Sequence, residues 1–279
     1  RHAFGRRIAE FELIKEKIAW MMGETWALES MTYLTAGLVD AHVSDYSLES
    51  AICKIFGSET LWRIASEALQ VAGGAGYMAS LPFERMLRDA RVNSIFEGTN
   101  EILRLYIAQS GMQAPARAMS EVNHAIRQPI KGFGLLSTFA VQKVRSSFGR
   151  KRLGRVHPLL AHEAEKFDSF SAELAKLVEQ TIRSHGKELK ERQLLQRRLA
   201  NMAIDLYALA ACLYRTTRDI ERFGEQGAAL ALSLTHAFSQ DAERRLTHNL
   251  VGMNKNRDTD DMNIAAQALA AGKYPFDVI

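Results

Sequence analysis

Cysteine is scarce in this 279-residue chain, which contains only Cys53 and Cys212. The two lie far apart in apolar surroundings, so we predict two buried free thiols rather than a disulfide, as is usual in a reducing compartment. Proline and glycine are also scarce, at 5 and 18 residues. Long stretches rich in Ala, Leu, Glu, Arg and Met, with few β-branched runs, therefore favour an all-α chain.

Long apolar runs are absent as well. No stretch reaches the roughly eighteen apolar residues that a membrane-spanning helix needs, and no signal peptide is recognisable. The histidines lack the spacing of metal ligands, so we predict no metal site. The first residue is Arg1 rather than Met, which we interpret as the start of a fragment or a processed product.

Acidic residues are absent between Val122 and His162, where eight Lys and Arg side chains are interleaved with apolar ones. This pattern is typical of an interfacial membrane-binding segment, in which each basic residue adds about 1 kcal/mol at an anionic lipid surface. A solvated linker packed on a neighbouring subunit is the alternative. No stacking platform or recognised motif supports nucleic-acid binding. We therefore predict peripheral membrane contact through this segment.

The periodicity of apolar residues predicts two helical regions on either side of the basic segment. Most of a four-helix bundle is expected from the first, with Ser47 as a helix N-cap. In the second, charged residues fit a helix surface with i, i+4 pairs. The predicted domains are residues 1–112, 113–157 and 158–279. The predicted helices cover residues 8–39, 47–72, 83–88, 100–111, 159–186, 187–221, 227–246 and 260–271.

One carboxylate stands out in the first region. Glu97 follows an apolar run and precedes Gly98 and a predicted helix that Thr99 would cap. In apolar, dewatered surroundings the pKa of a carboxyl group rises towards the value that a general base needs. The free N–H groups of the next helix can receive a phosphate or a developing oxyanion. The alternative is a helix-capping loop with a solvated Glu.

Three ordered motifs carry a resemblance to a known family. Residues 95–102 (IFEGTNEI) resemble the signature that closes the flavin site of acyl-CoA dehydrogenases. Upstream, residues 1–5 match R-x-x-F-G and residues 70–77 match Q-x-x-G-G-x-G-[YF]. The resemblance is close up to about Met112. A looser one, to the very-long-chain branch and to its relative that assists respiratory complex I assembly, continues to the C-terminus.

The resemblance implies a substrate site around Glu97, which matches the base that removes the α-proton of the acyl thioester. Phe96 would line the apolar pocket, the Glu97 backbone N–H would bind the thioester oxygen, and Gly98 would leave room for the acyl group. Thr99 and Glu101 match positions that contact FAD from the same subunit. Glu101 stands where part of the family has Gln.

The resemblance also implies a second group of cofactor residues. Arg1, Phe4, Gln70, Gly73 and Gly74 match positions that hold the adenosine half of FAD in the neighbouring subunit. A planar guanidinium suits pyrophosphate oxygens, and glycines allow close backbone approach. Because the implied site is made by two chains, we expect a homodimer.

The function implied is the α,β-dehydrogenation of long-chain acyl-CoA to trans-2-enoyl-CoA in fatty-acid β-oxidation, with electron-transfer flavoprotein as electron acceptor. The compartment would be a bacterial cytoplasm or a mitochondrial matrix, at the inner membrane. Without the N-terminal and β-domains of the family, this stretch alone is expected to be inactive. Two alternatives remain open: a non-enzymatic assembly or scaffold protein for a respiratory complex, and an acyl-CoA oxidase.

Overall fold

The computed structural model of the chain describes residues 1–127, 156–274 and 276. This part is almost entirely helical, which confirms the predicted all-α class. Its strands are β1 (His2–Ala3) and β2 (Arg6–Arg7), a short antiparallel pair with His2 opposite Arg7. Among the described residues, no helix combines the length and the apolarity that a bilayer crossing requires.

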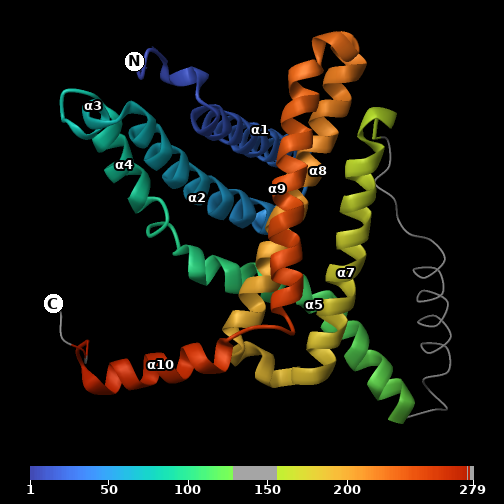
Figure 1. The fold of residues 1–279 in the computed structure, drawn as a ribbon. Helices are drawn as coiled ribbons and strands as arrows, with labels where there is room; N and C mark the ends of the chain where they lie inside the picture. The colour runs from blue at the N-terminus through green and yellow to red at the C-terminus, as the bar shows by residue number, and fades with distance from the viewer. Residues whose placement is uncertain (128–155, 275, 277–279) are drawn as a thin grey trace.

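The helices fall into two successive groups (Figure 1). The first group comprises the 3-10 turn η1 (Ile8–Glu10) and helices α1 (Glu12–Asp40), α2 (Ser47–Ala72), α3 (Gly74–Tyr77), α4 (Phe83–Val92) and α5 (Asn100–Arg127). The second group comprises η2 (Pro158–Leu160), α7 (Ala161–His185), η3 (Gly186–Glu191), α8 (Gln193–Gly227), α9 (Ala229–Gly252) and α10 (Asp258–Ala271).

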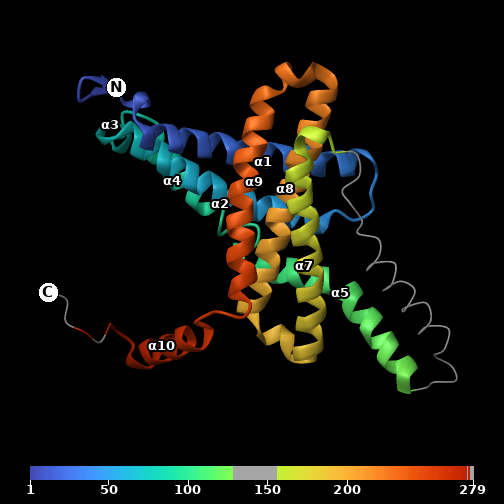
Figure 2. The ribbon, with the colours of Figure 1, turned by 45° about the vertical axis from the view of Figure 1, so that its right-hand side comes forward.

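Helix α8 is the centre of the packing. It forms an antiparallel pair with α9, and this pair stands against α1 and α2, with α7 on its other side (Figures 1 and 2). One stripe of its buried apolar residues recurs every three or four positions and comprises Leu199, Met202, Leu206, Leu209 and Leu213. Others, such as Ile204, Ala208 and Ala211, are buried between these positions, so α8 is covered on more than one face.

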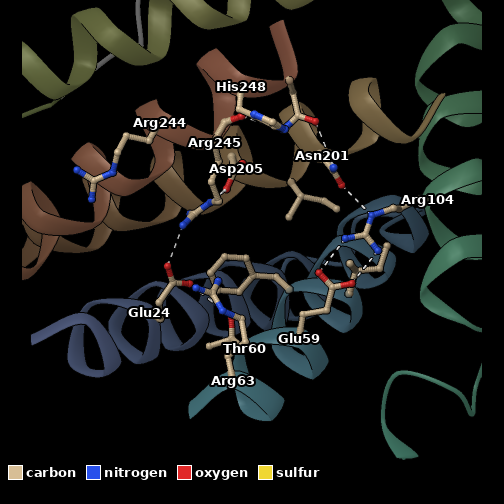
Figure 3. Close-up of a pocket in the computed structure, with 14 residues that line it drawn as sticks. Glu24, Glu59, Thr60, Arg63, Arg104, Asn201, Asp205, Arg244, Arg245 and His248 are labelled. Atoms are coloured by element: carbon tan, nitrogen blue, oxygen red, sulfur yellow. Dashed lines mark hydrogen bonds and ion pairs between the residues drawn. The ribbon is translucent and has the colours of Figure 1, made fainter. Parts of the chain in front are cut away.

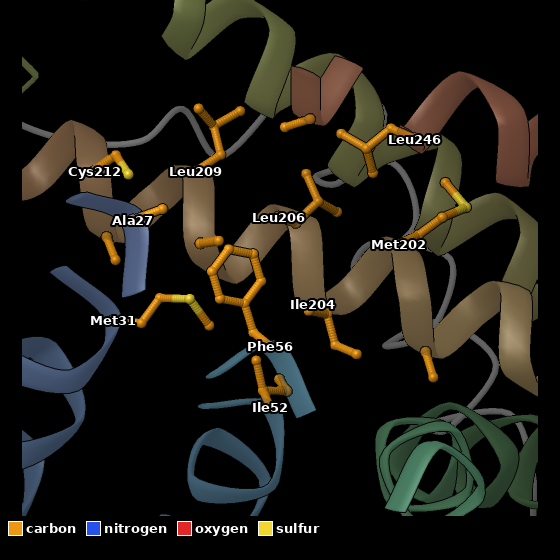
Figure 4. Packing of buried hydrophobic residues seen from close by; sticks show 14 of the residues in the cluster. Ala27, Met31, Ile52, Phe56, Met202, Ile204, Leu206, Leu209, Cys212 and Leu246 are labelled. Atoms are coloured by element: carbon orange, nitrogen blue, oxygen red, sulfur yellow. The ribbon is translucent and has the colours of Figure 1, made fainter. Parts of the chain in front are cut away.

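One hydrophobic core joins the two groups of helices (Figure 4). Met31 of α1 and Phe56 of α2 pack in the same cluster as Leu209 of α8 and Phe238 of α9. The rings of Phe56 and Phe238 meet edge to face, with 6.0 Å between centroids. The predicted division of the chain at residues 112 and 158 stays a prediction, but the core itself is shared.

Several predicted helix ends were wrong. Helix α1 begins at Glu12 rather than residue 8, because Ile8–Glu10 forms a 3-10 turn. Ser47 is the first residue of α2 and not its cap, since its N–H and hydroxyl donate to Asp45 Oδ1 at 3.0 and 2.6 Å. Helix α8 begins at Gln193 rather than at residue 187, because η3 intervenes.

Helix α5 does not end near Gly111 but continues to Arg127. A single glycine costs a helix only about 1 kcal/mol. Burial of Ile107, Ala108 and Met112 in the shared core offsets that cost. Residues 128–155, most of the predicted membrane-contacting segment, lie outside the described residues, so that contact stays a prediction.

The two cysteines are free thiols, as predicted. Cys212 is fully buried, and Cys53 is partly buried beside the Thr35 hydroxyl at 3.2 Å. Burial raises the pKa of both thiols. Neither is therefore a ready nucleophile.

Replacing Phe238 with Ala tests the shared core. Phe238 is 1% exposed, so Phe238→Ala should lower the free energy of unfolding by about 3–5 kcal/mol in denaturant titrations. Phe223→Ala is the control, because Phe223 is 55% exposed and its loss should cost less than about 0.5 kcal/mol. Equal effects of the two substitutions would contradict the described packing.

Candidate active site

The turn that carries Glu97 connects α4 to α5 and has an unusual backbone. Glu97 has φ 55° and Gly98 has φ 90°. For a glutamate the left-handed region is uncommon and costs roughly 1–2 kcal/mol. The turn is closed by the Asn100 N–H, which donates to the Ser94 carbonyl at 3.2 Å. Such strain persists only where surrounding contacts enforce it, and it is most frequent at functional sites.

The polar groups of this turn lie at the N-terminus of α5. Thr99 caps α5, as predicted, because its hydroxyl accepts a hydrogen bond from the Ile102 N–H at 3.4 Å. In the part of the chain that the structure describes, the Glu97 backbone N–H makes no hydrogen bond. That N–H is therefore available to an acceptor from outside the chain.

Lys54 of α2 is hydrogen-bonded to the turn that carries Glu97. Its Nζ donates to the Gly98 carbonyl at 2.7 Å and to Asn100 Oδ1 at 2.8 Å. Burial lowers the pKa of Lys54, against the opposing effect of the carboxylates of Glu101, Glu59 and Glu97. We did not predict this lysine from sequence. Its signal was a charge inside the apolar stripe of α2, directly before Ile55.

A cleft of about 710 Å³ opens beside the turn. Glu97 faces it from one side, and Lys54, Leu103 and Tyr106 line it from α2 and α5. Tyr106 donates to the Ser47 hydroxyl at 2.7 Å. The Glu97 side chain is exposed, and the predicted wall residue Phe96 is 49% exposed. The apolar, dewatered setting predicted for Glu97 therefore requires a further surface over this turn.

The second group of predicted residues lies near the N-terminus. The structure brings Arg1 and Gly73 together, since a Cβ at Gly73 would lie 2.6 Å from Arg1 Nη1. Gly73 has φ 64°, which a side chain would strain. Phe4, at φ 52° and 95% exposed, projects from the neighbouring turn, and Gln70 is exposed on the last turn of α2. These groups form an open cradle.

The two groups of predicted site residues, one around Glu97 and one around Arg1 and Gly73, lie at different points along α2. Lys54 supports the Glu97 turn, whereas Gly73 ends α2 nineteen residues later. At 1.5 Å per residue, about 28 Å of rigid helix separates these positions. The site residues around Glu97 therefore do not meet those around Arg1 and Gly73 within this chain (Figure 1). Glu101 is exposed in the first turn of α5, beside the first group, and Gly74 opens α3 beside the second.

A separate charged cavity of about 370 Å³ lies where α1 and α2 meet α8 and α9 (Figure 3). Arg245 donates to Glu24 at 2.9 Å and to Asp205 at 2.7 Å. Burial, only partly opposed by Arg245, raises the pKa of Asp205 to about 6. The prediction that the charges of the second region cover a helix surface is wrong for Asp205 and Arg198, which are buried.

No metal centre accompanies these sites in the described ranges 1–127 and 156–274. There, no three His, Cys, Asp or Glu side chains gather as they would around a metal ion. His236 and Glu163 form a single histidine–carboxylate contact, with 2.8 Å between His236 Nδ1 and Glu163 Oε1.

Comparison with known proteins places the chain. Residues 1–112 match the acyl-CoA dehydrogenase C-terminal domain, and residues 158–274 match the ACAD9/ACADV C-terminal domain. The chain belongs to the acyl-CoA dehydrogenase family. Its helical fold and the three motifs agree with this assignment, and the second match agrees with the predicted very-long-chain branch.

Individual acyl-CoA dehydrogenases align over most of the chain. The mitochondrial very long-chain specific enzyme of Rattus norvegicus is 34% identical over 94% of this chain and 40% of its own length. That of Homo sapiens is 38% identical over 79% of this chain and 34% of its own length. The Bacillus anthracis acyl-CoA dehydrogenase complexed with FAD superimposes with a TM-score of 0.74, at 28% identity, over 99% of this chain and 48% of that one. The chain thus spans less than half the length of these relatives.

The left-handed φ of Gly73 predicts a sharp difference between two adjacent glycines. Gly73→Ala should lower the free energy of unfolding by about 1–3 kcal/mol, because alanine is strained at this φ. The approach to Arg1 Nη1 adds little, since this flexible side chain can move aside. Gly74→Ala should be close to neutral, since nothing lies within 4 Å of its Cβ position. Chemical denaturation measures both. A neutral Gly73→Ala would contradict the left-handed backbone at Gly73.

Asp205 predicts a pH dependence of stability. Its pKa of about 6 when folded lies above the unfolded value near 3.9, so the folded state binds the proton more tightly. Stability contributed by this group therefore rises as the pH falls through 6. Relative to Asp205→Asn, the unsubstituted chain should gain about 1.4 kcal/mol between pH 7.5 and pH 5. Denaturant titrations at both pH values measure this gain, and parallel profiles would contradict it.

Proposed function

We propose that the protein containing this chain is an FAD-dependent acyl-CoA dehydrogenase acting on long-chain acyl thioesters, with Glu97 as the α-proton base. The observation that carries the proposal is the Glu97 turn. It presents a carboxylate from left-handed backbone at the edge of a cleft, beside a backbone N–H without a partner in the described chain. A helix-capping loop alone would not need the strained glutamate, because Thr99 already provides the cap.

The turn can act on both atoms that change charge when an α-proton leaves a thioester. The Glu97 carboxylate would take the proton. The Glu97 N–H would donate to the thioester oxygen, where negative charge develops as the proton departs. Gly98 would leave room for the acyl group, and its φ of 90° is one that glycine adopts without strain. Phe96 would contribute its ring to the wall that excludes water.

The residues of the two groups fit FAD. Arg1 offers a planar set of donors to pyrophosphate oxygens beside Gly73, whose missing Cβ lets Arg1 Nη1 lie close to the backbone. Thr99 and Glu101 would contact FAD on the Glu97 side. When bound, FAD supplies a hydride acceptor for the β-carbon of the substrate. Because about 28 Å of α2 separates the groups, we propose that each site takes one group from each chain of a homodimer.

The wider assignment is also a proposal. Electron-transfer flavoprotein would take the electrons, and residues 122–162 would hold the enzyme against a membrane in a bacterial cytoplasm or mitochondrial matrix. Mitochondrial relatives support the second compartment. The relatives extend well beyond this chain, so the activity is proposed for the protein that contains it.

Substitution of Glu97 tests the proposal in the full-length protein. Palmitoyl-CoA added anaerobically should bleach the flavin absorbance of the unsubstituted enzyme. Glu97→Gln should slow bleaching by at least about 100-fold with FAD still bound, because proton abstraction is lost. Glu225→Gln is the matched control, since it makes the same change at an exposed glutamate outside both groups of site residues.

The contradicting result is an unsubstituted protein that binds FAD but is not bleached by long, short or branched acyl-CoA. That result would favour the assembly or scaffold function. Bleaching that persists in Glu97→Gln would instead remove Glu97 from the proton step.

A further inference from the structure

A continuous set of hydrogen bonds leads from the Glu97 turn into the C-terminal helices. It starts at the Gly98 carbonyl, which accepts from Lys54. Lys54 also donates to Asn100 Oδ1, and Asn100 Nδ2 donates to Glu59 Oε1 at 3.1 Å. Asn100 is only 2% exposed, so its amide has little freedom to exchange these partners for water.

Glu59 of α2 is in turn paired with Arg104 of α5. Arg104 grips the Glu59 carboxylate with two nitrogens, each at 2.8 Å. Burial alone would raise the pKa of Glu59. The hydrogen bonds and charge of Arg104, together with the Asn100 hydrogen bond and the Arg63 charge, outweigh burial and hold the pKa below its usual value. A bidentate pair of this kind fixes orientation as well as distance.

Arg104 then reaches α8. Its Nε donates to Asn201 Oδ1 at 2.7 Å, and Asn201 Nδ2 donates to Asn249 Oδ1 of α9 at 3.3 Å (Figure 3). Asn249 is itself held, because its Nδ2 donates to the Arg245 carbonyl at 2.8 Å. The nitrogen of Arg104 that does not face Glu59 is thus oriented entirely from the second group of helices.

We propose that the α8–α9 pair positions the Glu97 turn through Asn201 and Arg104, with Asn201 as a positioning residue. The strained turn needs enforcement from outside itself, and Lys54 and Asn100 supply it. Asn100 is held in turn by the Ser58 hydroxyl, at 2.9 Å, and by Glu59, whose carboxylate Arg104 orients. Removing the Asn201 acceptor would leave Arg104 Nε without its partner, so the Arg104–Glu59 pair would shift to reach another acceptor and loosen the turn. The effect on proton abstraction rests on the proposed function, whereas the effect on the turn does not.

The test uses the full-length protein with Asn201→Leu, which removes the acceptor at similar volume. Gln109→Leu is the matched control, because Gln109 makes another polar contact from α5 to α8, to Gln196 at 3.0 Å. Asn201→Asp retains an acceptor for Arg104 Nε and should rescue. The first readout is amide hydrogen exchange of peptides covering residues 93–103. The second is the rate of anaerobic flavin bleaching across pH.

Asn201→Leu should speed exchange in residues 93–103 about tenfold, and Gln109→Leu should leave it unchanged. Bleaching should slow by about ten- to hundredfold at unchanged FAD affinity, because small misplacements of a catalytic group have effects of this size. In a Lys54→Met background, where the turn is already released, Asn201→Leu should add little.

Equal exchange in Asn201→Leu and Gln109→Leu would overturn the proposal, whatever the enzyme does with acyl-CoA. Faster exchange with unchanged bleaching would overturn the catalytic part, since the turn would be loosened without consequence. An unsubstituted protein that is never bleached would refute the proposed function. In that case the exchange comparison alone supports or overturns the structural link.

Discussion

The length and rigidity of α2 is the constraint on which the rest of the structure depends. Near its start, Lys54 holds the Gly98 carbonyl, and at its end Gly73 lies against Arg1. A continuous helix cannot shorten, so the carboxylate turn and the N-terminal cradle stay about 28 Å apart within one chain. Two groups that resemble parts of one flavin site therefore point to a site that two chains complete, which is how we interpret the family's motifs here.

The C-terminal helices are part of the same structural unit as the turn. Phe56 and Phe238 share one core, and Glu24 reaches across the junction to Arg245. Charges buried at such a junction are costly unless each is paired. Because Arg104 lies between Glu59 and Asn201, the polar contacts of the junction continue to the Gly98 carbonyl, next to the candidate base. The helices beyond residue 158 are thus placed to position the turn that carries Glu97.

Much of the fold could be predicted from the sequence, because the spacing of apolar residues identifies long helices. The Thr99 cap was also predictable, since its cause is local. Errors arose where tertiary contacts decide: core burial carries α5 past Gly111, and Asp205 is buried although its surroundings in sequence look like a helix surface. Lys54 was missed because its partners lie more than forty residues away. The left-handed backbone of Glu97 has no sequence signal of its own.

A mixed-dimer experiment tests the two-chain site most directly. Full-length protein with Glu97→Gln is combined with full-length protein carrying Arg1→Glu, each inactive as a homodimer. If one site takes its base from one chain and its cradle from the other, the mixed dimer contains one intact site and should recover about half of the activity. A correctly folded mixed dimer without activity would contradict the account, because it would place both groups in the same site of a single chain.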